Sequence, residues 1–387
     1  MVKKILILIS GLFVGIIIGF IFFYYTAVAS KDEDLISFIE HQISGEQVIG
    51  FLPYWLLSKA KTDYSPYITT LTYFGLTIDT DGTILKMQNP QENEPGWYAL
   101  QSGKADPFLN SATQKKQKLS LLVFNANEAS ISALMEKPIP HAQNLISDVK
   151  PIMQKYKFTD LNLDIESVKI ASDEARLRFS QFVKEVKKGM DDNNLGTLTI
   201  DISGDSLVKK RLINLADVES FVDYIVIMAY DYHYIGSQVT GPVAPLFGAG
   251  ISSEYDTQAA VEIALKTVPA KKIILGIPLY GYEWETIRDA THSATIPSSG
   301  QTASTQRISQ LLTSCATCSA QIDTEAKENY LIYKDGSTGT FHQIFYPDEK
   351  ATQAKIDFAK QQKIGGLALW ALGYEDLSIL EPLKKYR

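Results

Sequence analysis

The chain has little cysteine, little histidine and no long basic segment. Of its 387 residues, 2 are cysteine and 5 are histidine. The histidines are scattered and show no spacing typical of metal ligands, so we expect neither a metal nor another cofactor. The formal net charge is −7, and no long run of lysines and arginines follows the first few residues. Nucleic acid is therefore not an expected partner, and no segment indicates an obligate protein partner.

The two cysteines, Cys315 and Cys318, stand close together in the sequence SCATCS. As half of a zinc site, this pair lacks a second CxxC or nearby histidines. A redox role is not supported, because no thioredoxin-like βαβ pattern surrounds the pair. In an exported chain the spacing predicts a local disulfide that braces a turn, with two free thiols as the alternative.

The first residues contain a long apolar run. Lys3 and Lys4 precede an uncharged and mostly apolar segment from Ile5 to Ser30. This segment reaches the roughly 20 residues that cross a bilayer and exceeds the roughly 7–15 of a signal-peptide core. We therefore expect residues 1–30 to form a single transmembrane anchor in the cell membrane, with the rest of the chain outside. Ala27-Val28-Ala29 resembles a cleavage site, so a secreted protein cleaved near Ala29 is the alternative.

Short apolar runs alternate with amphipathic helical stretches from Val48 onward, which is typical of an α/β protein. Eight runs predict strands, at residues 48–55, 70–78, 118–125, 158–166, 195–203, 222–230, 272–281 and 365–373. The clearest helical patterns between them lie at residues 142–156, 172–190, 256–268 and 351–362. Eight such strands favour a closed (β/α)₈ TIM barrel over residues 48–387. A doubly wound open sheet is the alternative, and it is disfavoured because no strand is followed by GxGxxG or GxxxxGKS.

The regular spacing breaks between the seventh and eighth predicted strands, from Tyr282 to Ile364. A Ser/Thr-rich stretch comes first, followed by a short helix and then by two extended runs. Lys334-Asp335-Gly336-Ser337 joins these runs and predicts a hairpin. We expect a small α+β insertion subdomain at about residues 285–348 on the barrel mouth, and a charged helical linker at residues 31–47.

The fourth predicted strand carries an unusual set of polar residues. Asn162, Asp164 and Glu166 alternate with three aliphatic residues in FTDLNLDIES, which puts the polar trio on one face, toward the barrel axis. Burying ionised groups without partners is costly, so they must neighbour each other, water or a ligand. A nearby negative charge raises the pKa of a carboxyl, which can then act as a general acid. A structural salt-bridge cluster is the alternative, but no lysine or arginine lies between Phe158 and Val168.

Several segments resemble one known family in the correct order along the chain. TDLNLDIE (159–166) is similar to the DGxDxDxE signature of glycoside hydrolase family 18, the chitinase family. MAYD (228–231) matches the MxYD of that family, and GGLALW (365–370) matches its final strand. FLPYW (51–55) and GIPLYGYEW (276–284) also fit. The compact insertion is closest in style to the bacterial spore-germination and chitobiase-like branches.

The resemblance implies a glycosidase that acts on β-1,4-linked N-acetylglucosamine polymers, chitin or peptidoglycan. Glu166 would be the catalytic acid, and Asp164 and Tyr230 would hold the substrate's acetamido group. That group would attack the anomeric carbon in a retaining, substrate-assisted reaction. The remaining substrate-binding residues would be Asn162, Asp231, Trp370, Tyr54 and Tyr280. Trp370 would lie beneath the sugar ring, whereas packing against the insertion is the alternative for Tyr54 and Tyr280.

Two positions depart from the family signature. Thr159-Asp160 replaces its Asp-Gly, and Asn162 replaces its middle aspartate. Asparagine at this position also occurs in the chitobiase-like branch, although it removes one carboxylate from the row behind Asp164. A lectin-like carbohydrate-binding protein on the same barrel, without turnover, is therefore the alternative function. The retained Glu166 favours the enzyme.

Overall fold

The computed structural model describes residues 46–251, 253–315 and 318–386. The predicted anchor at residues 1–30 and nearly all of the predicted linker lie outside this part of the chain. Within the residues described, no helix combines the length and the apolar character needed to cross a membrane.

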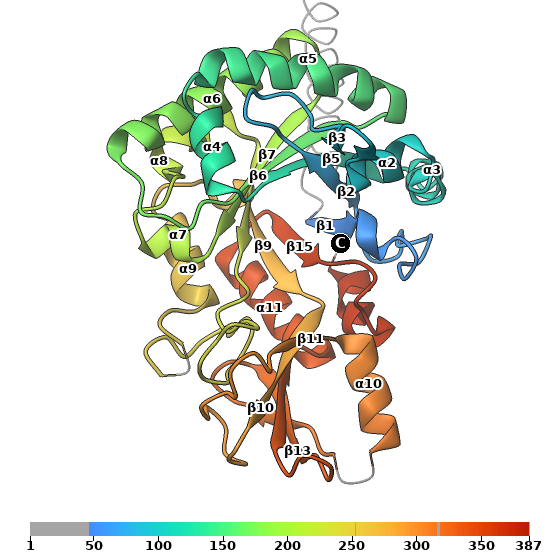
Figure 1. Cartoon of the computed structure of the whole chain (residues 1–387), viewed down its shortest axis with the longest axis vertical. Helices are drawn as coiled ribbons and strands as arrows, with labels where there is room; N and C mark the ends of the chain where they lie inside the picture. The colour runs from blue at the N-terminus through green and yellow to red at the C-terminus, as the bar shows by residue number, and fades with distance from the viewer. Residues whose placement is uncertain (1–45, 252, 316–317, 387) are drawn as a thin grey trace, which may run out of the picture. The chain divides into compact units, whose positions relative to one another are not determined.

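Eight parallel strands close into a barrel, in the order β1-β15-β9-β8-β7-β6-β5-β2 (Figure 1). The strands are β1 (Gln47–Pro53), β2 (Thr70–Thr77), β5 (Lys118–Asn125), β6 (Asp160–Ile165), β7 (Thr197–Ser203), β8 (Tyr224–Met228), β9 (Ile273–Pro278) and β15 (Gly366–Trp370). The first strand pairs with the last from Gln47 and Gly366 to Gly50 and Leu369, which removes the free edges of the sheet. The predicted TIM barrel is confirmed, and the doubly wound alternative is wrong.

Alternate residues of the barrel strands serve two separate cores. On β6, Leu161, Leu163 and Ile165 are buried in the large outer core beneath the helices. Residues of the opposite face, such as Phe51 and Leu122, form a smaller core inside the barrel. This period of two follows from the pleat of a strand, and it is the reason that the polar residues of β6 lie on the inner face.

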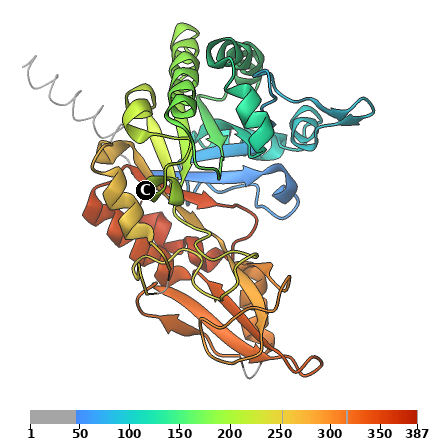
Figure 2. The ribbon, with the colours of Figure 1, turned by 60° about the vertical axis from the view of Figure 1, so that its left-hand side comes forward.

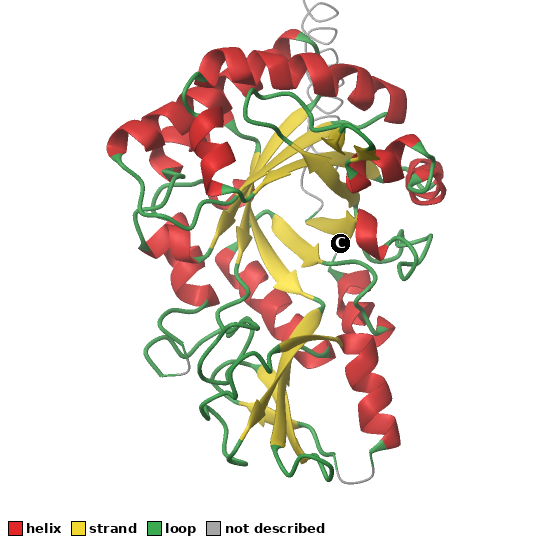
Figure 3. Cartoon of the chain, in the orientation of Figure 1, coloured by secondary structure: helices red, strands yellow, loops and turns green. Residues whose placement is uncertain are grey.

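Helices surround the strands on the outside of the barrel, as the red and yellow elements of Figure 3 show. They are α2 (Pro95–Gln101), α3 (Asp106–Gln114), α4 (Glu128–Leu134), α5 (Pro138–Tyr156), α6 (Asp173–Asp192), α7 (Asp205–Val208), α8 (Leu215–Val218), α9 (Thr257–Ala264) and α11 (Glu349–Gln362). The side chains of Ser172 and Asp256 cap the amino-terminal ends of α6 and α9. Helix α5 starts before its predicted residue 142, because Pro138 suits the first turn of a helix. A small hairpin of β3 (Met87–Asn89) and β4 (Glu92–Asn93) lies in the β2–α2 connection.

The insertion forms an antiparallel sheet beside the barrel, coloured orange in Figure 2. It contains β11 (Gln301–Ser304), β10 (Tyr280–Thr286), β14 (Phe341–Tyr346), β13 (Glu328–Lys334) and β12 (Gln321–Asp323), in this spatial order, together with α10 (Thr305–Ser314). The predicted hairpin is confirmed as β13 and β14. The strand predicted over 272–281 is divided, because residues from Tyr280 onward pair with the insertion strands rather than with the barrel.

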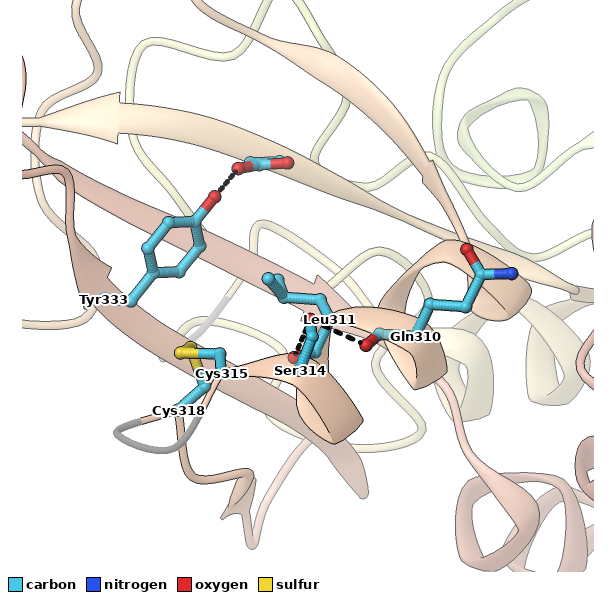
Figure 4. The surroundings of a disulfide bond; sticks show 7 residues. Gln310, Leu311, Ser314, Cys315, Cys318 and Tyr333 are labelled. Atoms are coloured by element: carbon cyan, nitrogen blue, oxygen red, sulfur yellow. Dashed lines mark hydrogen bonds between the residues drawn. A yellow bond between two sulfur atoms is a disulfide. The ribbon is translucent and has the colours of Figure 1, made fainter.

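Cys315 and Cys318 form a disulfide directly after α10 (Figure 4). The hydroxyl of Ser314, the last residue of α10, donates to the carbonyls of Gln310 (3.0 Å) and Leu311 (3.2 Å). The backbone N–H of Cys318 donates to the carbonyl of Cys315 (3.2 Å), so the disulfide joins two residues that are also connected by a backbone hydrogen bond. The predicted local disulfide is confirmed, and the alternative of two free thiols is wrong.

Candidate active site

Three carboxyl groups meet where β6 and β7 end. Asp164 is the next-to-last residue of β6, Glu166 follows that strand directly, and Asp201 lies in β7. Leu163 pairs with Ile200 in the register of the two strands. The residues one step further on, Asp164 and Asp201, therefore lie side by side, and each is only 3% exposed.

Burial raises the pKa of all three carboxyl groups, and neighbouring negative charges add to this effect. Burial is the largest cause of the high pKa of Asp164, and the charges of Glu166 and Asp201 raise this pKa further. Burial likewise raises the pKa of Asp201, and the charge of Glu166 adds to the effect. The pKa of Glu166 is raised by burial first and then by the charge of Asp231. The cluster therefore retains protons at a higher pH than separate carboxyl groups do, as a general acid requires.

Two further polar residues of β6 lie deeper in the barrel. Asn162 is 1% exposed, and its amide opposes the rise in the pKa of the neighbouring Asp201. Three hydroxyl groups donate to the Asp160 carboxylate, from Ser120 (2.6 Å), Thr197 (2.6 Å) and Thr199 (2.9 Å). Asp160 thus has partners from both flanking strands. Asn162, predicted to bind substrate, lies beneath the carboxyl cluster and lines neither of the two cavities described below.

Asp231 faces the cluster from the segment that follows β8. Its Oδ1 accepts hydrogen bonds from the hydroxyls of Tyr280 (2.5 Å) and Tyr282 (2.9 Å), both on β10. Asp231 as a whole residue is exposed, at the wall of the cavities described below. Loss of water around its carboxylate raises its pKa, and the hydrogen bonds from the two hydroxyls oppose this rise. Tyr280, predicted to bind substrate, is 3% exposed and lines neither cavity. In this structure Tyr280 holds Asp231.

Tyr230 lies between the acids and keeps its hydroxyl proton. Burial is the largest cause that raises its pKa far above the ordinary value, and the charge of Asp201 is the next. The hydroxyl is consequently a hydrogen-bond donor at any physiological pH.

Two cavities meet at this group of residues. One has a volume of about 340 Å³ and the other of about 500 Å³. The residues that line both are Glu166, Asp201, Met228, Tyr230 and Asp231. We call the smaller one the Trp370 lobe and the larger one the Tyr255 lobe, after an aromatic residue that lines each. Glu166 therefore stands at the junction of two spaces, and a chain molecule that fills both passes beside it.

The Trp370 lobe has an aromatic wall. Trp370 packs against Phe74 (ring centroids 5.1 Å apart) and Phe51 (5.9 Å). Tyr54 and the half-exposed Trp55 also line this lobe, together with Asp164 and Glu94. Aromatic faces beside a few polar groups suit the apolar face and the hydroxyls of a sugar ring. Among the described residues that line the lobe, none is a lysine or an arginine.

The structure thus brings most of the predicted site residues together. Glu166, Asp164, Tyr230, Asp231, Trp370 and Tyr54 all line the Trp370 lobe. Asp201 and Glu94 also line this lobe and are not among the predicted site residues. Asp201 could have been found, because TLTIDIS alternates polar and aliphatic residues just as the β6 segment does. Glu94 could not, because it reaches the lobe from the amino-terminal end of α2 and belongs to no strand pattern.

A closed parallel barrel with a proton-retaining acidic cluster and an aromatic-lined cavity at the carboxyl ends of its strands is the architecture of a barrel glycosidase. Comparison with known families agrees. The family "Glycosyl hydrolases family 18" matches residues 24–375. The chain belongs to this family, and it is a glycoside hydrolase.

Three related proteins show 22–24% identity to the chain. The chain is 24% identical over 327 residues to a cortical fragment-lytic enzyme of Bacillus anthracis, which covers 82% of this chain and 67% of the relative. It is 24% identical over 312 residues to a class V chitinase of Arabidopsis thaliana, covering 75% and 78% of the two chains.

Solved structures share the fold. A Group IV chitinase of Ostrinia furnacalis in complex with allosamidin superposes with a TM-score of 0.73 at 20% identity, and the match covers 88% of this chain and 97% of that one. The spore cortex-lytic enzyme SleL of Bacillus cereus superposes with a TM-score of 0.67 at 22% identity, covering 87% and 73%. These matches confirm the barrel.

Proposed function

We propose that the protein hydrolyses β-1,4-linked N-acetylglucosamine polymers, chitin or peptidoglycan, with retention of configuration and with the substrate's acetamido group as nucleophile. The position of Glu166 at the junction of the two lobes carries this proposal. A glycan that occupies both lobes has one linkage at the junction, beside a carboxyl group whose pKa is raised by burial. Glu166 then protonates the oxygen of that linkage.

The arrangement of the acids supports a nucleophile from the substrate. Direct displacement with retention needs a second carboxylate across the scissile bond from the acid, roughly 5–5.5 Å away. Asp164 and Asp201 instead belong to the same wall as Glu166, since all three come from β6 and β7. Asp231 already accepts two tyrosine hydroxyls on one oxygen. The acetamido oxygen supplies the missing nucleophile.

The reaction then has two steps. Glu166 gives its proton to the leaving oxygen, the glycosidic bond breaks, and the acetamido oxygen bonds to the anomeric carbon as an oxazolinium ion. Asp164 accepts the acetamido N–H and stabilises the positive charge, while Tyr230 donates to the acetamido oxygen. Glu166 then takes a proton from water as the base, the water oxygen bonds to the anomeric carbon, and the bond between that carbon and the acetamido oxygen breaks. Trp370 lies beneath the sugar ring and Asp231 binds its hydroxyl groups.

The names of the relatives support this class of substrate. Two kinds recur, enzymes named for the lysis of cortex or cortical fragments and enzymes named as chitinases. One plant chitinase of the same fold was crystallised with (GlcNAc)3. We therefore propose an N-acetylglucosamine-containing glycan as the substrate. We also propose that residues 1–30 anchor the enzyme to the membrane with the barrel outside the cell, on the basis of the apolar run alone.

The test is hydrolysis by wild-type protein and the Glu166→Gln variant. Chitin oligomers and purified peptidoglycan are incubated with each, and mass spectrometry identifies the products. We expect the wild type to cut only linkages that follow an N-acetylated sugar, and we expect the variant to bind glycan but lose about 1,000-fold or more in kcat. Binding without turnover by the wild type would indicate the lectin-like alternative. Equal cutting of oligomers with glucosamine before the scissile bond would contradict the acetamido mechanism.

A further inference from the structure

The segment directly after Glu166 has no regular structure of its own. Residues 166–172 belong to no helix or strand, and they connect β6 to α6. Two apolar side chains of this segment lie in solvent, since Val168 is 71% and Ile170 is 80% exposed. Near the other end of the segment, Ala171 packs against the outer core and its backbone N–H donates to the carbonyl of Lys210 (3.0 Å). Apolar packing therefore fixes the end next to α6, whereas the exposed Val168 does not fix the end that carries Glu166. The position of Glu166 depends on polar contacts.

The Glu128 carboxylate makes three of these contacts. Its Oε1 accepts the backbone N–H groups of Val168 (2.8 Å) and Lys169 (3.2 Å). Its Oε2 accepts the hydroxyl of Ser167 (2.9 Å). Each oxygen thus binds the chain one to three residues after Glu166. Hydrogen bonds to an ionised acceptor are roughly twice as strong as neutral ones.

Strand β5 connects to both Glu128 and Glu166. Glu128 is the first residue of α4, which follows β5, the strand next to β6 (Figure 1). The backbone N–H of Glu166 itself donates to the carbonyl of Asn125, the last residue of β5 (2.9 Å). On the other side of the segment, Arg211 donates to the carbonyl of Val168. Hydrogen bonds therefore hold the backbone on both sides of Glu166. The N–H of Glu166 binds β5, and residues 167–169 bind Glu128.

We propose that Glu128 is a positioning residue for Glu166, which aims the Glu166 carboxyl at the junction of the two lobes by fixing residues 167–169. The role in catalysis rests on the proposed function. Glu128 lines neither the Trp370 lobe nor the Tyr255 lobe, so it acts through the backbone and not through the substrate. A misplacement of about 1 Å in a reacting group can cost on the order of 100-fold in rate.

Glu128→Gln tests the proposal in the full-length protein. The variant keeps one acceptor oxygen for the two backbone N–H groups and presents an N–H₂ group to the Ser167 hydroxyl, which can accept from it. The negative charge that strengthens all three bonds is lost. We expect kcat to fall about tenfold with KM changed less than about twofold, and the limb of the pH–rate profile that reports Glu166 to shift. Amide hydrogen exchange at Val168 and Lys169 is expected to become about tenfold faster.

Two further variants complete the experiment. Ser167→Ala removes only one of the contacts and should lower kcat about threefold, which keeps the test usable if Glu128→Gln does not fold. Glu136→Gln removes the same charge from an exposed position just beyond α4 and should change neither kcat nor exchange.

The outcomes are distinct. Faster amide hydrogen exchange with an unchanged kcat and pH profile would overturn the positioning role. Unchanged exchange would show that Glu128 does not hold residues 167–169. A fall in thermal stability together with equal losses at all pH values would indicate a merely structural residue and would also overturn the proposal. Wild-type protein that cleaves no glycan would refute the proposed function, whereas the exchange data would still decide whether Glu128 holds the segment.

Discussion

Asp160 and Asp164 lie on the same face of β6 and have opposite surroundings. Asp160 accepts three hydroxyl groups from the flanking strands. Asp164 instead faces the charges of Glu166 and Asp201, which raise its pKa beyond the effect of burial. The partners of a buried carboxyl thus set its pKa, because donated hydrogen bonds oppose the rise that burial causes whereas neighbouring like charges add to it.

We expect Asp160→Asn to reduce the pH dependence of stability. Burial raises the pKa of Asp160 to about 6 from an ordinary value of 3.8, so the folded protein binds this proton more tightly than the unfolded chain. The resulting stabilisation is complete below about pH 3.8 and is lost as the pH rises through about 6, a change of about 3 kcal/mol. Urea unfolding of the wild type and of Asp160→Asn between about pH 4 and about pH 7.5 measures this change in the free energy of unfolding.

The same strand offers a matched control for Asp160→Asn. Asp164→Asn should lower kcat about 100-fold or more, because it removes the charge beside the proposed oxazolinium ion. Asp160→Asn should retain most of the activity. Stability curves of equal slope for wild type and Asp160→Asn would contradict the assignment of this proton to Asp160.

At the scale of elements, a buried ion pair connects the insertion to the barrel. Glu328 is the first residue of β13, and its Oε1 lies 3.5 Å from the Nζ of Lys355 in α11. The Glu328 carboxylate also accepts the backbone N–H groups of Val243 (2.9 Å) and Ala244 (3.0 Å). These two residues lie in the long segment after β8 that begins at Ala229 and carries Tyr230 and Asp231. The insertion therefore supports the segment that carries part of the site.

We expect Glu328→Gln to lower the free energy of unfolding by about 3–5 kcal/mol, because it leaves Lys355 buried without its counter-charge. Burial already lowers the pKa of Lys355 and raises that of Glu328, so the charges gain little from each other beyond their desolvation cost. The double variant Glu328→Gln/Lys355→Met should recover much of the loss in urea unfolding. A double variant as unstable as the sum of the two single changes would contradict the coupling.

At the scale of the whole molecule, the proposed anchor sets where the barrel works. An uncharged run of this length gains enough from the hydrocarbon core of a bilayer to resist extraction. We expect the full-length chain to remain in the membrane pellet after washes with salt and alkali, and a chain of residues 31–387 to stay in the supernatant. Immunoblots of the fractions provide the measurement. A mature protein that begins at Ser30 would instead support the cleaved-signal alternative.

The sequence by itself determined the barrel and most of its acidic site. The eight strands follow from short apolar runs, and the inner position of Asp164 follows from a period of two. Both signals are local, because the pleat of a strand assigns each side chain to a face without reference to the rest of the chain. The hairpin of the insertion and the Cys315–Cys318 disulfide are likewise local, and both were predicted.

The tertiary structure alone decided which groups meet. Asp201 lies beside Asp164 only because β7 pairs with β6 in one register, and Tyr280 reaches Asp231 only because the chain leaves the barrel after β9 to begin the insertion. The hydrogen bonds between Glu128 and the segment after Glu166 join residues about 40 positions apart. Contacts of this kind depend on strand register and barrel closure, which bring distant segments together and leave no period in the sequence.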